Sequence, residues 1–119
     1  MPATKALSTI IAAGTSNAAL ATTNGTAVNL LTAYGGVITG LLTNGAIGPT
    51  IQAVAFVETS GDNTNWKEVA QVGGGVTAGV ITPLSYPVDP GVMYARVRVT
   101  GNTGQPVVCE AFMQVLTAI

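Results

Sequence analysis

The fold is decided by residues 92–116, which read VMYARVRVTGNTGQPVVCEAFMQVL. Apolar and polar residues alternate through 92–100, and a period of two is typical of a β-strand whose faces differ. Glycine, asparagine and proline at 100–106 predict a turn between two successive strands. We expect the apolar set to face the core and the other set, with both arginines, to face outward: Met93, Ala95, Val97 and Val99 against Tyr94, Arg96, Arg98 and Thr100.

The strand expected at 106–116 is partly apolar on both faces. One face can join the core, and the other then needs a second layer or another subunit to cover it. Uncharged strands of this kind aggregate at an open sheet edge, so the pattern indicates a protein that assembles. The strand at 50–58 has the same character. The faces of 106–116 are Val107, Cys109, Ala111, Met113 and Val115 against Val108, Glu110, Phe112, Gln114 and Leu116.

The rest of the chain after residue 26 reads as short strands separated by turn residues. Fifteen glycines and six prolines are spread along a chain rich in β-branched residues, which favours strands over helices. Strands are expected at 27–32, 36–43, 50–58, 66–72, 78–86, 92–100 and 106–116. This spacing predicts an all-β domain over 27–119, a single antiparallel β-sandwich or jelly-roll-like fold.

Residues 1–26 differ from the rest. They are rich in alanine, threonine, serine and asparagine, carry one charge at Lys5, and show no steady period beyond a short strand near 7–12. Such a segment buries too little apolar area to order itself. We expect an extended N-terminal arm that becomes ordered on a partner, with a functionless frayed terminus as the alternative.

The composition indicates a covered surface. Only 8% of the 119 residues are charged and the net charge is −1, against about 25% charged residues in typical soluble domains. A free monomer with so few charges has weak colloidal protection, so we expect neighbouring subunits to cover it. The alternative is a soluble monomer with a threonine- and asparagine-rich surface. Four basic residues are too few for binding nucleic acid or an anionic membrane.

The sequence shows no catalytic constellation, because its five acidic residues have no spacing that marks a pair. The chain has no histidine and one cysteine, Cys109, so we expect no catalytic, cofactor or metal site and no enzymatic activity. Cys109 is expected to be a buried apolar residue. No spanning segment or leader is evident, so we expect synthesis and assembly in a cytoplasm.

The segment 58–66 is the most distinctive local feature. Glu58, Asp62, Asn63 and Asn65 carry oxygens that suit calcium, but the spacing does not match an EF-hand loop. A hairpin turn whose side chains bond their own backbone is the favoured interpretation. Trp66, which follows, is expected to fill the end of the core.

Turn residues recur along most of the chain, at 43–46, 48–50, 65–67, 73–75, 89–92 and 100–104. Together with the alanine- and threonine-rich start, they resemble a group of small structural proteins of tailed bacteriophages. The resemblance implies a virion component on the capsid surface, a cement or decoration protein that stabilises the shell of major capsid protein as a dimer or trimer. A tail or head–tail connector subunit is left open. No functional residues carry over.

A second resemblance is to the discoidin-like sandwich. It rests on residues 60–66, which end at Trp66, and on Tyr94-Ala95-Arg96-Val97-Arg98. This chain lacks the Asp-Gly of that family's turn and is short for the family. The resemblance implies a carbohydrate-binding module as the alternative function.

Residues of the arm and of the outward strand faces are the candidates for contact with capsid or neighbouring subunits. Arg96 and Arg98 are expected to form ion pairs between subunits or to be solvated. The candidate interface residues are Lys5, Leu7, Ile10, Ile11, Tyr94, Arg96, Arg98 and Phe112.

Overall fold

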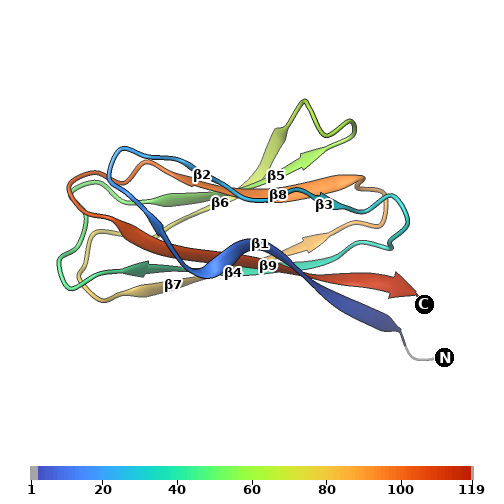
Figure 1. The fold of residues 1–119 in the computed structure, drawn as a ribbon, viewed down its shortest axis with the longest axis horizontal. Coiled ribbons are helices and arrows are strands. Elements are labelled where there is room, and N and C mark those ends of the chain that lie inside the picture. Colours follow the sequence, from blue (N-terminus) through green and yellow to red (C-terminus); the bar gives the residue numbers. More distant parts are fainter. Residues whose placement is uncertain (1–2, 119) are drawn as a thin grey trace.

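Two antiparallel sheets pack face to face in the computed structural model, which describes residues 3–118 (Figure 1). No helix in this range is long and apolar enough to cross a membrane. The strands are β1 (Thr4–Asn17), β2 (Thr23–Asn24), β3 (Val28–Asn29), β4 (Gly36–Asn44), β5 (Val54–Ser60), β6 (Lys67–Gly73), β7 (Ile81–Val88), β8 (Tyr94–Thr100) and β9 (Val107–Ala118).

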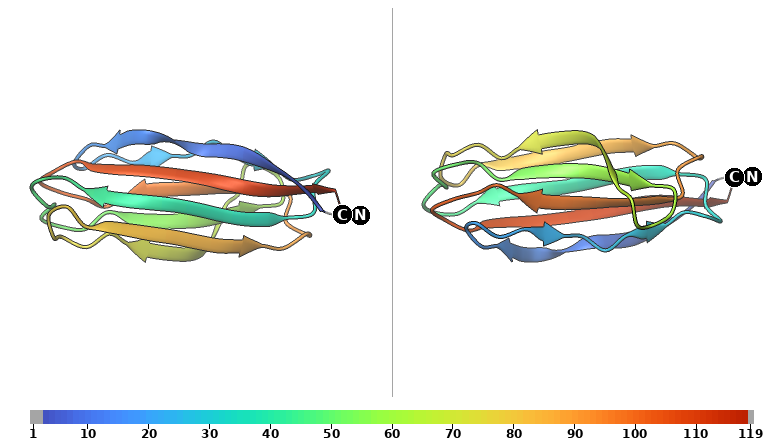
Figure 2. Two further views of the ribbon diagram at one scale, coloured as in Figure 1. Left: turned by 90° about the horizontal axis from the view of Figure 1, so that it is seen from below. Right: turned by 90° about the horizontal axis from the view of Figure 1, so that it is seen from above.

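The topology is that of a jelly roll. Sheet A has the order β1-β9-β4-β7, and sheet B has the order β2-β8-β5-β6, with β3 also paired to β8. The two views of Figure 2 show these sheets from opposite sides. We count β2 and β3 as one interrupted strand. Among the described strands, only the β5–β6 hairpin then joins two neighbours within a sheet, because every other connection crosses from one sheet to the other. The predicted all-β sandwich with jelly-roll character is therefore confirmed.

The core lies between the inner faces of the two sheets. Ala95, Val97 and Val99 of β8 are at most 1% exposed, as their alternation predicts. All five residues predicted for the inner face of β9 are buried, Cys109 among them, and burial raises the pKa of its thiol. The prediction that Met93 faces the core is wrong, because Met93 precedes β8 and is 47% exposed.

The N-terminal segment is part of the sandwich. β1 pairs antiparallel with β9 and forms one edge of sheet A. A register shift between Thr9 and Ile11 turns two successive side chains inward, so Ile10 and Ile11 are both buried in the core. A bulge of this kind interrupts the two-residue period, which is why the sequence pattern showed no strand of this length. The prediction of a free arm over 1–26, separate from a domain at 27–119, is wrong for residues 4–17.

Each sheet edge carries a feature that hinders pairing with another strand. β1 is shifted in register at several points, and β2 and β3 are two residues each. β7 contains Pro83 and Pro87, which donate no backbone hydrogen bond. In β6, Val69 is left out of the register between Glu68 and Ala70. These features hinder the addition of another strand at each edge of the two sheets.

Candidate interaction surfaces

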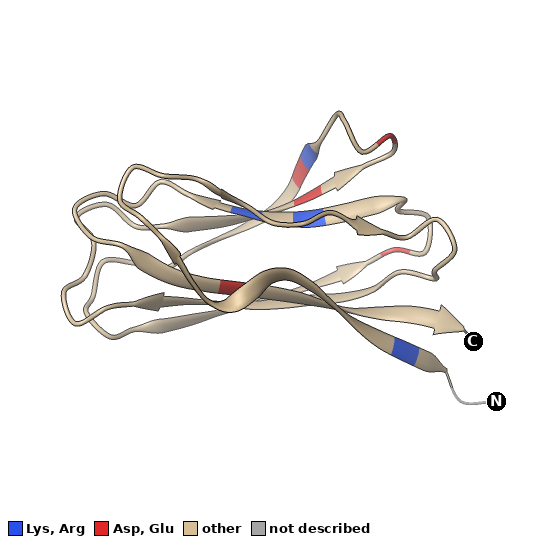
Figure 3. Cartoon of the chain, in the orientation of Figure 1, with Lys and Arg blue, Asp and Glu red and all other residues tan. Residues whose placement is uncertain are grey.

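The outer face of sheet A is apolar and nearly uncharged. Cross-strand register places outward residues of β1, β9, β4 and β7 side by side. Among the described residues, the charges on this face are Lys5 and Glu110, and Figure 3 shows how sparse charge is there. Leu7 and Ile81 are 67% and 57% exposed. We call this surface the apolar face; its apolar residues are Leu7, Val37, Leu41, Ile81, Pro83, Pro87, Val108, Phe112 and Leu116.

A hollow lies at one end of the apolar face. It has a volume of about 340 Å³ and is lined by Lys5, Gly36, Val37, Gln114 and Leu116. These residues come from β1, β4 and β9, the three neighbouring strands of sheet A. The hollow is large enough for an apolar side chain, and Lys5 supplies the one charged residue of its lining. Such pockets at the centre of an interface hold the side chains that contribute most to affinity.

The outer face of sheet B carries a cluster of charged and aromatic side chains. Glu58 of β5 lies opposite Arg96 of β8, and the side chain of Glu58 is 9% exposed. Arg96 Nε donates to Glu58 Oε1 at 2.9 Å, and Arg98 Nε donates to Glu58 Oε2 at 3.4 Å. The guanidinium carbon of Arg96 lies 4.2 Å from the ring centroid of Trp66, and that of Arg98 lies 4.5 Å from the ring centroid of Phe56. We call these five residues the arginine ladder.

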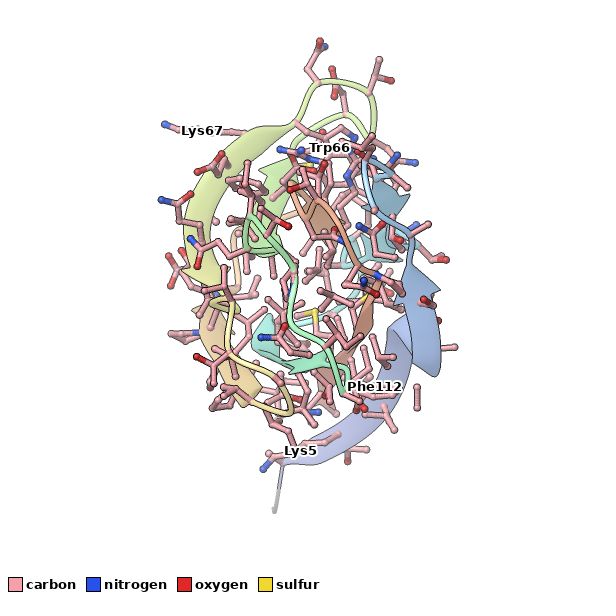
Figure 4. The ribbon with its side chains drawn as sticks, turned by 90° about the vertical axis from the view of Figure 1, so that its left-hand side faces the viewer. Lys5, Trp66, Lys67 and Phe112 are labelled. Atoms are coloured by element: carbon pink, nitrogen blue, oxygen red, sulfur yellow. The ribbon has the colours of Figure 1, made fainter. Side chains whose placement is uncertain are left out.

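Stacking and ion pairing hold the ladder together. A guanidinium over an aromatic face adds about 0.5–1 kcal/mol at an exposed site and more where water is excluded. The carboxylate of Glu58 is buried, so it depends on its two cationic partners. Trp66 therefore lies half-buried on the outer face of sheet B, and the prediction that it fills the end of the core is wrong. Figure 4 shows Trp66 and Phe112 on opposite sides of the sandwich.

The candidate interface residues fall in three places. Lys5, Leu7 and Phe112 lie together on the apolar face. Ile10 and Ile11 are core residues at 3% and 4% exposure, so their assignment to an interface is wrong. The outward residues of β8 lie on sheet B, where both arginines form ion pairs with Glu58 of the same chain and are 23% and 27% exposed. The outward residues of β8 are Tyr94, Arg96 and Arg98.

The loop between β5 and β6 is a turn held by Asp62. Its carboxylate accepts hydrogen bonds from the backbone N–H groups of Asn65 and Thr64, from the Asn65 side-chain amide and from the Ser60 hydroxyl. The bonds from the Asn65 and Thr64 backbone are the main reason that the pKa of Asp62 is held well below its ordinary value. This is the turn predicted as the alternative to a calcium loop. Within residues 3–118, no three histidine, cysteine or acidic residues are grouped to hold a metal ion.

The Asp62 turn predicts a dependence of stability on pH. Because the folded pKa lies below the unfolded value of 3.8, the unfolded chain takes up the proton first. The stabilisation is therefore complete above about pH 5 and is lost as the pH falls through about 4 toward the folded pKa. We expect Asp62→Asn to lower the melting temperature at pH 7 and to differ less from wild type at pH 3. Asp89→Asn removes an exposed carboxylate from another turn and should change the melting temperature less at pH 7. Equal effects of the two variants would contradict the role of the Asp62 carboxylate in stabilising its turn.

Comparison with known proteins gives the fold. No protein-family model matches the chain, and no curated protein sequence matches it. The crystal structure of the SPBc2 prophage-derived protein YomS is similar, with a TM-score of 0.52 and 10% identity over 96% of both chains. Chains of infectious bursal disease virus, from the Gx strain and from the T13 viral particle, are similar with TM-scores of 0.60, at 12% and 11% identity over 95% and 96% of this chain. This chain spans 32% and 31% of those two chains. At such identities the likeness establishes a shared jelly-roll fold.

Proposed function

We propose that this chain is a non-enzymatic virion structural protein, a capsid cement or decoration protein that binds the major capsid protein through its apolar face. The observation that supports this proposal is the apolar face. It is a sheet surface of exposed leucine, isoleucine, valine and proline, with two charges among the described residues. Jelly rolls serve viral capsids as well as lectins and cupins, so the fold alone leaves the role open. The similar structures from a prophage and from a virus favour the virion.

The size of the apolar face suits a stable interface. Four strands of about nine residues cover roughly 600 Å² in projection, from strand spacings of about 4.8 Å and rises of about 3.4 Å. A standard interface buries about 800 Å² of accessible surface on each partner. Ordering and association costs offset much of the hydrophobic gain, so affinity depends on how well a partner fills the hollow near Lys5.

The sheet edges support binding through a face. Register shifts, prolines and short strands hinder the addition of a strand at each edge. Copies of this chain, as a dimer or trimer, and subunits of the shell are the partners in this proposal. Attachment through a face with two charged residues is weakened little by salt, because screening acts on charges. The protein would then be assembled in the host cytoplasm and would remain on the capsid surface.

The experiment compares Leu7→Asp with Ile47→Asp. Both residues are 67% exposed, but Leu7 is on the apolar face and Ile47 is in the loop after β4. We expect Leu7→Asp to lower occupancy of purified shells by tenfold or more, a cost of about 1.4 kcal/mol or more, because an unpaired carboxylate is buried at the contact. Ile47→Asp should bind as wild type does. Co-sedimentation with shells that lack the protein measures occupancy, and thermal melts check the fold of both variants.

Two results would overturn the proposal. One is equal occupancy by Leu7→Asp and wild type; the other is a wild-type chain that stays monomeric at high concentration and binds no shell. Electron microscopy of the virion separates the shell from the alternative of a tail or head–tail connector subunit. The carbohydrate alternative lacks a free aromatic platform at Trp66, because the guanidinium of Arg96 covers that ring. We therefore expect no glycan binding that depends on Trp66.

A further inference from the structure

The arginine ladder has unused hydrogen-bond donors. Arg96 and Arg98 each give Nε to Glu58, and within residues 3–118 their terminal nitrogens have no hydrogen-bond acceptor. Their side chains are 23% and 27% exposed. Each guanidinium therefore keeps the edge formed by Nη1 and Nη2, which matches a carboxylate in a bidentate pair.

The ladder also leaves a positive charge on this face. Two guanidiniums face one buried carboxylate, so the cluster carries a net charge of about +1. Glu68 lies opposite Glu58 on β6, where it is exposed and pairs with neither arginine. The adjacent Lys67 is exposed as well. An incoming anion would meet the arginines without displacing an existing partner.

The two guanidiniums are held in place before any ligand arrives. Glu58 fixes each Nε, and the rings of Trp66 and Phe56 lie under the two guanidinium planes. Immobilising a long side chain on binding costs about 0.5–1.5 kcal/mol, and here folding has already met that cost. Arg96 and Arg98 also lie two residues apart on one strand, so their Cα atoms are about 6.8 Å apart.

We propose that the arginine ladder is a binding site for an extended acidic segment of a partner protein, with carboxylates at alternate positions. An extended segment places residues i and i+2 on one side at the same spacing of about 6.8 Å, so one carboxylate reaches each guanidinium. Adjacent acidic residues point to opposite sides, and only one of them can bind. This site is on the opposite face from the one proposed to dock on the shell, and it does not depend on that docking.

The test uses the isolated chain and two peptides of the same composition. Thr-Glu-Thr-Glu-Thr carries alternate carboxylates, and Thr-Thr-Glu-Glu-Thr carries adjacent ones. We expect titration calorimetry at low salt to give about tenfold tighter binding of the alternate peptide, the gain from one further charge-assisted pair. Arg96→Lys/Arg98→Lys keeps the charge but loses the planar fork, so the preference should disappear. Lys67→Gln removes a neighbouring exposed charge and should keep it.

The outcomes are decisive in both directions. A preference for the alternate peptide that Lys67→Gln keeps and the double lysine variant loses supports the site. Equal binding of both peptides, no binding at millimolar peptide, or a preference that survives in the lysine variant overturns it. Arg98→Lys alone, which leaves the 2.9 Å pair between Arg96 and Glu58, provides the same comparison if the double variant does not fold. These results do not depend on whether Leu7→Asp binds shells, so the proposed function and this proposal can fail separately.

Discussion

Removal of residues 1–17 should unfold the sandwich. The deletion takes away β1, which pairs with β9 along Thr4–Asn17 and places Ile10 and Ile11 in the core. Loss of a buried isoleucine costs about 2–5 kcal/mol, so the two together approach the total stability of about 5–15 kcal/mol expected for a domain. The deletion also opens the edge of β9, a largely apolar strand whose one charged residue is Glu110, and an open edge of this kind promotes aggregation. Circular dichroism and urea unfolding of the purified variant measure the effect.

Leu7→Ala is the matched control for the deletion. Leu7 is on the same strand but is 67% exposed, so its truncation should change the free energy of unfolding by no more than about 0.5 kcal/mol. Ile10→Ala/Ile11→Ala should lose most of the stability that the deletion loses. A deletion variant that melts cooperatively within a few degrees of wild type would show that the first strand is dispensable, as expected of a free arm.

The bounds of four strands were predicted to within about two residues. β4 and β6 were expected at 36–43 and 66–72 and are found at Gly36–Asn44 and Lys67–Gly73. β8 and β9 were expected at 92–100 and 106–116 and are found at Tyr94–Thr100 and Val107–Ala118. Only a short strand near 7–12 was expected within β1, because the register shifts near Thr9–Ile11 and again between Ile11 and Thr15, so inward and outward residues no longer alternate. A pattern search assumes a regular pleat, and an edge strand with bulges has none.

The arginine ladder was beyond the reach of pattern alone. Glu58 and Phe56 are two residues apart and so share one side of β5, and alternation placed both arginines outward on β8. What joins them is the pairing of β5 with β8, in which Glu58 faces Arg96 across 38 residues of sequence. That neighbour relation comes from the jelly-roll order of the strands and from no local signal. The two arginines were therefore expected to pair with other subunits or to be solvated, and Glu58 was not predicted to be their partner.

The turn residues specify the fold more than a surface. Asn102 is fully buried in the turn between β8 and β9, where its amide donates to the carbonyls of Asn17 and Gln105. These bonds hold the end of β1 next to that turn. The asparagine- and glycine-rich turns were the basis of the resemblance to phage structural proteins, and such residues determine backbone path. The surfaces that distinguish one role from another are formed by the outward residues of the strands.

Gly36→Ala should cause the largest loss of stability from a single methyl group. Gly36 has φ of 151°, and a Cβ at this position would lie 2.0 Å from the carbonyl oxygen of Gln114 and 3.2 Å from the Cα of Val115. Both contacts are backbone atoms of β9, so the strands themselves must separate. Strained backbone and overpacking each cost about 1–3 kcal/mol. At about 4 °C or more per kcal/mol, a loss near 3 kcal/mol lowers the melting temperature by roughly 12 °C or more.

Gly61→Ala is the control, because a Cβ at Gly61 has no heavy atom within 4 Å. It should melt within about 2 °C of wild type, as exposed substitutions do. Gly36 also lines the hollow on the apolar face, so Gly36→Ala should lose shell binding together with stability. Leu7→Asp should lose binding alone, since Leu7 is exposed. A Gly36→Ala variant as stable as wild type would mean that β4 and β9 can separate at this point. The hollow would then be deformable and poorly suited to holding a partner's side chain.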